Sequence, residues 1–281
     1  MRYVFLIVAL AFVVPGVGLA KEHPESSHGK GQVPQCRPAG SEKGDHEHGR
    51  GHEKHEQVRS CPHAASPLLT GLVSYWNLDG NSRDAVGGND GSDVAMTYGA
   101  AYGVLGHGAL FDGVSSAIGL GNPANLNITG DLSIAMWVYP LEMAEAGSVF
   151  AKTVGNGASD NTYDLAFFDD APMQMVYANG TYFYIDSGAH LPSHTWSHVV
   201  FTRGNGNAEV RFYIDGVDAG LSNDHWAAIT PLTGGDVFIG RRGNGNFFHG
   251  YVDEVGVWNR VLSPAEIAAL YAGGAGKTYP F

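Results

Sequence analysis

From residue 66 onward, short runs of β-branched and aromatic residues alternate with glycine-rich turns. The clearest runs are residues 72–78, 131–139, 173–178, 181–186, 196–203, 209–214, 236–240 and 251–258. Most of them alternate polar and apolar side chains, which is the period of a strand with one buried face. The chain also contains 40 glycines in 281 residues. This pattern predicts an all-β domain with many turns.

Two dipeptides between these runs are typical of tight hairpin turns. Asn179-Gly180 follows residues 173–178, and Asp215-Gly216 follows residues 209–214. Both suit a type I′ turn, whose two central residues need positive φ. Hairpins pair strands in antiparallel fashion, and this many strands bury their inner faces only by stacking as two layers. We therefore expect a two-sheet antiparallel β-sandwich.

One helix is predicted near the end of the chain. Ser263 and Glu266 form a capping-box pattern, with proline between them at the first helical position. Leu262 and Ile267 are placed for a hydrophobic staple, and Gly273 follows the last apolar residue. The apolar residues of this segment fall on one face, so we expect a single short helix that packs on the sandwich.

Residues 1–20 have the features of a secretory signal peptide. Arg2 precedes an apolar run over residues 3–14, and Gly18-Leu19-Ala20 places small residues at the expected cleavage site. The run is too short for a spanning helix, which needs about 20 residues, and no later segment is long and apolar enough. We expect a mature protein that is secreted, either extracellular or periplasmic.

Residues 21–65 are predicted to form a disordered linker or tail. They hold seven of the 13 histidines, equal numbers of acidic and basic residues, and almost no large apolar side chains. Such a segment cannot bury enough surface to offset the entropy cost of ordering its backbone. Four histidines with interleaved acids could bind zinc, copper or nickel, or could simply belong to a pH-sensitive spacer. These are His46, His48, His52 and His55.

The two cysteines of the chain, Cys36 and Cys61, also lie in this tail. In an oxidising compartment we expect them to pair as a disulfide. The other interpretation is that Cys61 supplies a thiolate to a metal.

Residues 66–281 form one predicted domain of strongly acidic character. They contain eight basic and 21 acidic residues, a formal charge of −13. This charge argues against nucleic acid and anionic membrane surfaces as partners. It suits calcium, which binds oxygen ligands.

Several motifs resemble the laminin G-like, concanavalin A-like jelly-roll domains. The stretch from Gly250 to Tyr271, with Val-Asp-Glu-Val-Gly-Val-Trp and Leu-Ser-Pro-Ala-Glu-Ile, resembles their C-terminal signature. Four further motifs occur in the order typical of these domains. They are an aromatic strand with an Asp/Asn/Gly-rich loop at 72–91, Gly-Ala-Leu-Phe-Asp-Gly at 108–113, Trp-Ser-His-Val-Val at 196–200 and Phe-Tyr-Ile-Asp-Gly at 212–216. The resemblance implies a jelly roll. It leaves function open, because lectins, adhesion modules, pentraxins and glycosidases share this fold.

The catalytic members of this superfamily carry Glu-x-Asp-x-x-Glu on one strand, whose spacing projects the acids onto one face. No such run is present. Asp253 and Glu254 are adjacent, so in a regular strand they point to opposite faces, and no nucleophile motif occurs elsewhere. We therefore expect no enzymatic activity.

A structural calcium is implied by the same resemblance. In laminin G-like relatives the ion is often held by an Asp and by carbonyls of the opening loop, which here implies Asp253 with Asp84 and the Asn77–Asp79 region. Asp253 would share a strand face with core valines, where a carboxylate is costly unless it is paired or coordinated. The alternative is that Asp253 accepts backbone hydrogen bonds and Asp84 starts a turn.

Carbohydrate recognition requires exposed aromatic rings near polar groups. The candidates are Tyr182 and Tyr184 on one strand, Trp226 in a polar loop, and Phe248 after a Gly/Asn-rich loop. The two tyrosines could equally be a packing pair in the sheet. The other tryptophans, namely Trp76, Trp137, Trp196 and Trp258, sit in strand patterns and are expected in the core.

We conclude that the sequence favours a secreted, calcium-stabilised binding module for glycans or protein surfaces. The first alternative is an extracellular structural or adhesion protein with a metal-chelating His-rich tail. The second is a divergent glycoside hydrolase.

Overall fold

The computed structural model describes residues 65–141, 147–154, 161–167, 172–178, 182–204, 206, 209–221, 234–243 and 245–281. The chain divides into residues 1–63 and residues 64–281, and all described residues belong to the second unit. The predicted signal peptide and nearly all of the predicted tail therefore lie outside the described residues. Within them, no helix is long and apolar enough to cross a membrane.

The first sheet, here sheet A, has eight antiparallel strands. Its order is β13 (Val217–Leu221), β12 (Glu209–Ile214), β11 (Ser197–Gly204), β6 (Leu132–Pro140), β15 (His249–Trp258), β4 (Gly108–Asp112) and β3 (Thr97–Gly99). The eighth strand, β1 (Leu72–Trp76), also pairs with β15. β15 is thus the most connected strand and lies at the centre of the sheet.

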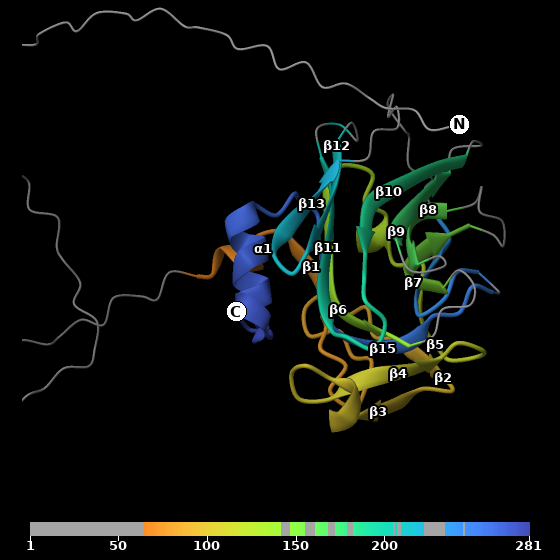
Figure 1. Cartoon of the computed structure of the whole chain (residues 1–281). Coiled ribbons are helices and arrows are strands. Elements are labelled where there is room, and N and C mark those ends of the chain that lie inside the picture. The colour runs from red at the N-terminus through yellow and green to blue at the C-terminus, as the bar shows by residue number, and fades with distance from the viewer. Residues whose placement is uncertain are drawn as a thin grey trace, which may run out of the picture. The chain divides into compact units, whose positions relative to one another are not determined.

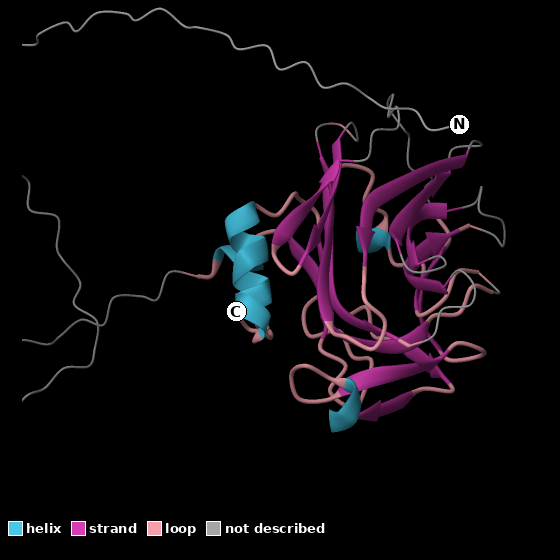
Figure 2. Cartoon of the chain, viewed as in Figure 1, coloured by secondary structure: helices cyan, strands magenta, loops and turns pink. Residues whose placement is uncertain are grey.

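The second sheet, sheet B, has seven antiparallel strands. Its order is β10 (Tyr182–His190), β9 (Pro172–Ala178), β8 (Asn161–Phe167), β7 (Gly147–Thr153), β14 (Asp236–Ile239), β5 (Ala117–Gly121) and β2 (Ser92–Val94). The remaining elements are short 3-10 turns: Pro67–Leu69, Ala100–Tyr102 (η2), Ala124–Leu126 and Ala272–Gly274. Figure 2 shows how strands dominate the described part of the chain.

The main core lies between the two sheets. It contains fully buried aromatic residues from both layers, including Trp76, Phe111 and Phe201 of sheet A and Phe150 of sheet B. The strand alternation of the sequence produces this arrangement, because every second residue of each strand points inward. The predicted two-sheet sandwich with one C-terminal helix is confirmed, and its topology is consistent with a jelly roll.

The helix α1 (Pro264–Tyr271) covers the outer face of sheet A, the face turned away from sheet B (Figure 1). The capping box is present, since Ser263 Oγ accepts from the Glu266 amide and Glu266 Oε2 accepts from the Ser263 amide at 2.8 Å. Leu262, Ile267 and Leu270 are buried against sheet A in a second cluster. This cluster occupies one part of the outer face, and the loop around Val104 and Leu105 covers another part at Asp253.

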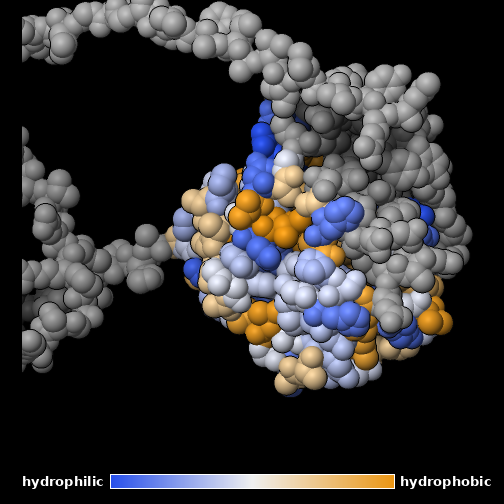
Figure 3. Space-filling view, in the orientation of Figure 1, coloured by the Kyte–Doolittle hydropathy of each residue, from blue (hydrophilic) through white to orange (hydrophobic). Residues whose placement is uncertain are grey.

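The two predicted hairpins differ in how much of them is described. Asp215 and Gly216 have φ values of 52° and 76°, which confirms the type I′ turn between β12 and β13. Asn179 and Gly180 lie outside the described residues, although β9 and β10 do pair in antiparallel fashion. On the described surface, hydrophobic residues form scattered patches among hydrophilic ones (Figure 3).

Candidate functional site

A β-bulge in β15 changes the predicted positions of its two acids. The register against β6 shifts between Asp253 and Gly256, and Glu254 has a φ of 52°. Val252 and Val255 both point into the main core, whereas residues three apart in a regular strand point to opposite faces. The bulge inserts one extra residue between them and so restores the inward direction at Val255. The expectation that Asp253 shares a face with Val255 is therefore wrong. Both acids lie toward the outer face of sheet A.

The Asp253 carboxylate is buried but only half of it is hydrogen bonded. Its Oδ2 accepts from the amides of Val104 and Leu105 at 2.8 and 2.9 Å, and its Oδ1 is buried without a partner among the described residues. Burial raises the pKa of Asp253 to about 8. Backbone hydrogen bonds from Leu105, Val104 and Glu254 oppose this rise, and the Glu254 charge adds to it. This site therefore favours either a proton or an added cation.

Glu254 has the same character. The Tyr75 hydroxyl donates to its Oε2, while Oε1 is buried without a partner among the described residues. Burial raises the pKa of Glu254 to about 7. Hydrogen bonds from the Tyr75 and Thr278 side chains oppose this rise, and the Asp79 charge adds to it. Each of these two buried carboxylates has one oxygen without a partner among the described residues, and a bound cation would offset their buried negative charge.

Asp84, the second predicted calcium ligand, has a different environment. Its Oδ1 accepts from the amides of Tyr75 and Val86, and its Oδ2 accepts from the Asn89 amide, all at 2.9 to 3.0 Å. Both oxygens thus face N–H donors, which disfavour a cation. Asp84 organises the opening loop, as the alternative interpretation expected.

The last two predicted ligands, Asn77 and Asp79, lie at the surface of the opening loop. Asp79 Oδ1 accepts from the His107 amide at 2.6 Å, and its Oδ2 accepts from the Asn77 side chain at 3.1 Å. Among the described residues, no three His, Cys, Asp or Glu side chains gather as a metal-binding group. The predicted four-residue set is therefore not assembled by side chains, and Asp253 with Glu254 is the part that fits an ion.

Four half-buried aromatic rings, here called the aromatic row, cross the outer face of sheet A. Tyr139 on β6 and Tyr251 on β15 are direct cross-strand partners, with ring centroids 4.9 Å apart and ring planes at 17°. Trp196, just before β11, contacts Tyr139 at 5.5 Å. Tyr102, in η2, contacts Tyr251 at 5.0 Å. The row therefore combines two paired strands, the residue that precedes β11, and the turn η2.

The alternation of the strands explains why these rings reach the surface. Val138 and Val252, the chain neighbours of Tyr139 and Tyr251, are fully buried in the main core, so the tyrosines point outward. The hydroxyls of the three tyrosines make no hydrogen bond to a described residue, which leaves them available to a ligand. Half-exposed rings with polar tips are well suited to sugars, which present both apolar C–H faces and hydroxyls.

The aromatic row was missed by sequence reasoning. Trp196 was expected in the core and is half-buried on the outer face instead, because it precedes β11 on the outward side. The signal available in the sequence was the outward phase of Tyr139 and Tyr251 relative to their valine neighbours. The pairing of β6 with β15, more than 100 residues apart in the chain, could not be read from that phase.

The aromatic residues predicted to bind sugar are not part of the aromatic row. Phe248 is fully buried in the main core, with Phe111 and Phe167 as ring neighbours, so that prediction is wrong. Tyr182 and Tyr184 belong to β10, but their side chains lie outside the described residues. The same holds for Trp226 and for the tail residues His46, His48, His52, His55, Cys36 and Cys61, so these predictions stay untested.

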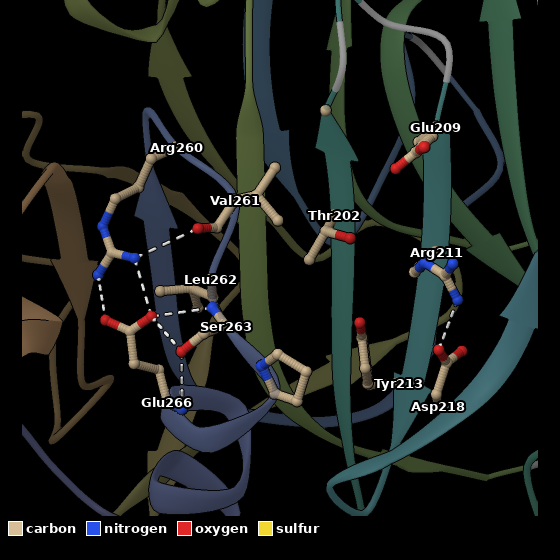
Figure 4. A pocket seen from close by; sticks show the side chains of 12 residues that line it. Thr202, Glu209, Arg211, Tyr213, Asp218, Arg260, Val261, Leu262, Ser263 and Glu266 are labelled. Atoms are coloured by element: carbon tan, nitrogen blue, oxygen red, sulfur yellow. Dashed lines mark hydrogen bonds and ion pairs between the residues drawn. The ribbon is translucent and has the colours of Figure 1, made fainter. Parts of the chain in front are cut away.

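A groove of about 500 Å³ lies elsewhere on the outer face, between β11, β12 and the N-terminal end of α1 (Figure 4). On one side Arg211 forms an ion pair with Asp218 at 2.7 Å. On the other, the Arg260 guanidinium makes two hydrogen bonds to Glu266 at 2.6 and 2.9 Å and lowers the pKa of that carboxyl to about 2. These two pairs account for four of the five charged residues that line the groove, and the fifth is Glu209.

Comparison with known proteins identifies relatives of the fold. The family model of the concanavalin A-like lectin/glucanases superfamily matches residues 112–268. No curated protein matches the chain. The matched span includes three residues of the aromatic row, both bulge acids and most of the groove.

Solved structures with the same fold share little sequence. Domain 4 of AbnA, an extracellular arabinanase from Geobacillus stearothermophilus in complex with arabinotriose, is 18% identical over 70% of this chain and 97% of that chain, with a TM-score of 0.57. Trypanosoma rangeli sialidase is 18% identical over 74% of this chain and 33% of that chain, with a TM-score of 0.55. The binding domain of Paraclostridial Mosquitocidal Protein 1 is 16% identical over 72% of this chain and 52% of that chain, with a TM-score of 0.55. The chain thus spans about a third of the sialidase and nearly all of the arabinanase domain.

Proposed function

Because the chain belongs to the concanavalin A-like lectin/glucanase superfamily, we propose that its β-sandwich is a secreted, non-catalytic carbohydrate-binding module. The observation that carries this proposal is the aromatic row, which places four half-buried rings side by side across the outer face of sheet A. Further support comes from domain 4 of the arabinanase, a separate domain of the same fold whose structure contains arabinotriose.

The non-catalytic part of the proposal is supported by the burial of the acids. Glycoside hydrolysis requires two carboxyl groups that reach the sugar from opposite sides of the scissile bond. Asp253 and Glu254, the adjacent acids with raised pKa values, are 0% and 4% exposed. They can support the fold or hold an ion, but a polysaccharide cannot reach them.

In this proposal the sugar lies over the aromatic row. Trp196 and Tyr102 at its two ends provide ring faces for apolar C–H contacts, and the central pair Tyr139 and Tyr251 provides hydroxyls. The cross-strand spacing of the rings, 4.9 to 5.5 Å, is close to the length of one pyranose residue. A polysaccharide that runs across the strands could therefore contact one ring with each sugar.

The proposed calcium belongs to this module as a structural ion. Asp253 Oδ1, together with Glu254 Oε1, would hold it, and backbone carbonyls would complete a shell of six to eight oxygens. When bound, calcium neutralises the two buried carboxylates and so stabilises the central strand β15. It does not take part in sugar contact in this proposal.

The test is binding of the full chain to a panel of polysaccharides by affinity electrophoresis and calorimetry, with arabinan, xylan, cellulose and chitin as probes. We expect Trp196→Ala to lower affinity by roughly tenfold or more, since one aromatic contact of this kind contributes about 1–3 kcal/mol by analogy with base–aromatic stacking. Arg211→Ala, in the groove, is the matched control and should bind as the wild type does.

Two further outcomes separate the alternatives. If Arg211→Ala loses affinity and Trp196→Ala keeps it, the groove and not the aromatic row is the sugar site. If Trp226→Ala alone abolishes binding, the loop predicted from sequence is the site. A wild-type protein that binds none of the polysaccharides, or that hydrolyses one of them, would contradict the proposed function.

A further inference from the structure

Arg241 is a half-buried arginine whose guanidinium lies over an aromatic ring. Its guanidinium carbon lies 4.1 Å from the centre of the Phe238 ring, and its Nε is buried without a hydrogen-bond acceptor among the residues that the structure describes. No ion pair or hydrogen bond joins Arg241 to any described residue. Buried donors almost always have an acceptor in a native protein, and a bound anion would supply one to this Nε.

Five of the other seven cations of the domain differ from Arg241 in this respect. Residues 66–281 contain eight Lys and Arg residues, and five of them have acceptors. Arg211, Arg242 and Arg260 form ion pairs with carboxylates, whereas Lys152 and Arg203 donate to side-chain or backbone oxygens. Arg241 has lost solvent at Nε without gaining such a partner, and this desolvation lowers the pKa of its guanidinium, with Asp236 acting in the opposite direction.

The surroundings of Arg241 form a fixed platform on the outer face of sheet B. Phe238 points outward from β14, because its neighbours Val237 and Ile239 are in the main core. Its cross-strand partner on β5 is Gly119, and a Cβ built there would lie 3.7 Å from the Phe238 ring. The ring therefore lies close over the sheet, and the guanidinium of Arg241 stacks on it. Such stacking orients the planar guanidinium and reduces the entropy lost when it binds a ligand.

The adjacent Arg242 does not compete for the same ligand. Its guanidinium donates to the buried Asp164 at 3.2 Å and to Asn246 at 3.1 Å. Arg242 is therefore neutralised and held in place, while Arg241 keeps its positive charge. Arg241 is thus an oriented cation that no described residue pairs with by a hydrogen bond, although the Asp236 charge acts on it.

We propose that Arg241 binds the carboxylate of an acidic sugar, such as a uronic acid within a polysaccharide, on the outer face of sheet B. A carboxylate accepts two parallel hydrogen bonds from a guanidinium, and its planar shape matches the fork that Phe238 orients. The acidic-sugar identity rests on the proposed carbohydrate-binding function; the need for an anion rests on Arg241 alone. This site is separate from the aromatic row, which lies on the other sheet.

The net charge of the domain limits which acidic polysaccharides could bind at Arg241. A formal charge of −13 over residues 66–281 repels a dense polyanion. Arg241 therefore suits a polysaccharide with widely spaced carboxylates, such as a xylan with occasional glucuronate side groups, better than a polyuronate. Increasing salt should weaken this contact less than it weakens binding to a polyanion, because only one charge pair is formed.

The experiment compares the full chain with glucuronoxylan and with the same xylan after reduction of its carboxyl groups, by calorimetry. We expect the wild type to prefer the acidic form by about tenfold, the factor for one charge-assisted hydrogen-bonded pair. Arg241→Gln should remove this preference and leave affinity for the reduced xylan unchanged. Arg211→Gln, an exposed arginine in an ion pair, is the control and should keep the preference. Equal affinity of the wild type for both xylans, or a preference kept by Arg241→Gln, overturns the proposal.

A second measurement keeps the proposal separate from the proposed function. The Nε–H resonance of Arg241, assigned by its loss in Arg241→Gln, is followed by NMR during titration with methyl glucuronide and with methyl glucoside. A shift with the glucuronide alone supports the Arg241 site even if the chain binds neither xylan. In that case the proposed polysaccharide site at the aromatic row is contradicted and the Arg241 proposal is not. No shift overturns the proposal. A larger shift with an acidic peptide assigns the site to a protein carboxylate and overturns the sugar assignment.

Discussion

Tyr139 and Tyr251 stack across two adjacent strands, although more than a hundred residues separate them in the chain. Their ring centroids are 4.9 Å apart and their planes differ by 17°, and both rings point away from the main core. An offset stacked pair contributes about 0.5–1.5 kcal/mol beyond the burial of its area. The pair therefore stabilises the contact between β6 and β15 and fixes the centre of the aromatic row.

We expect this pair to show measurable coupling. Tyr139→Ala and Tyr251→Ala should each lower the free energy of unfolding by about 1–3 kcal/mol, and the double variant should lose about 1 kcal/mol less than the sum. Chemical denaturation of the four proteins measures the coupling. Tyr251→Phe is the control, because it keeps the ring and removes only the hydroxyl. Additive losses would mean that the two rings do not stabilise one another.

Much of the fold was predictable because its signals are local. Strand alternation, the Asp215-Gly216 turn and the capping box of Ser263 and Glu266 each depend on residues close together in the chain. These features, with the family motifs, led to the two-sheet sandwich and its single helix. The bulge at Glu254 was not predictable in this way, because nothing in Val-Asp-Glu-Val marks the residue that will adopt positive φ.

The candidate site was harder to predict because it depends on pairing between distant strands. Trp196, Tyr139 and Tyr251 become neighbours only through the order β11, β6, β15 in sheet A. Phe248 was assigned to the surface because it follows a Gly/Asn-rich loop, yet the chain turns inward there and the ring joins the main core. The two-residue alternation of side chains identifies which residues share a face of one strand. It does not identify which strands are neighbours in a sheet.

His198 should make stability depend on pH. Its ring is buried between Trp137 and Tyr271, at centroid distances of 5.1 and 6.2 Å, while Asp215 accepts from its backbone amide. Burial lowers the pKa of His198 to about 4, so the folded state keeps it neutral while the unfolded state, with a pKa near 6.5, takes up a proton. Stability from this group is therefore complete above about pH 6.5 and is lost as pH falls toward 4.

His198→Phe should reduce that loss. The replacement keeps an aromatic ring between its two neighbours and cannot be protonated. Between pH 7 and pH 4.5 we expect the free energy of unfolding to fall by up to about 3 kcal/mol more in the wild type than in the variant. Urea denaturation at the two pH values provides the measurement. Equal pH dependence of the two proteins would show that His198 is not a source of acid lability.

Two glycines test how tightly sheet B packs against the core. Gly240 has a φ of 89°, and an added Cβ would lie 2.1 Å from the ring of Phe111. Gly121 has a φ of 65°, and a Cβ added to Gly121 would have no atom within 4 Å. Gly121→Ala should therefore cost about 1 kcal/mol of stability for backbone strain alone, whereas Gly240→Ala should cost at least about 2 kcal/mol more because Phe111 must move. Thermal unfolding of both variants compares them, and similar midpoints would contradict the close contact.

The calcium proposal is tested by thermal unfolding of the full chain in EDTA and in added calcium. An ion that binds only the folded state stabilises it by about 2.7 kcal/mol when its concentration is a hundred times the dissociation constant. We expect calcium to raise the wild-type midpoint and to have little effect on Asp253→Asn, because Asp253 Oδ1 is a buried oxygen without a partner among the described residues and is a proposed ligand of the ion. Glu254→Gln should reduce the response for the same reason.

Asp84→Asn is the control that separates the two acids predicted together from the sequence. It weakens the three amide hydrogen bonds that hold the opening loop, so its midpoint in EDTA should fall. Its response to calcium should nevertheless match that of the wild type, because both Asp84 oxygens already face N–H donors. If Asp84→Asn loses the response and Asp253→Asn keeps it, the ion lies at the opening loop. If calcium stabilises none of these proteins, then Asp253 acts only as a hydrogen-bond acceptor for Val104 and Leu105, and its buried Oδ1 carries a proton.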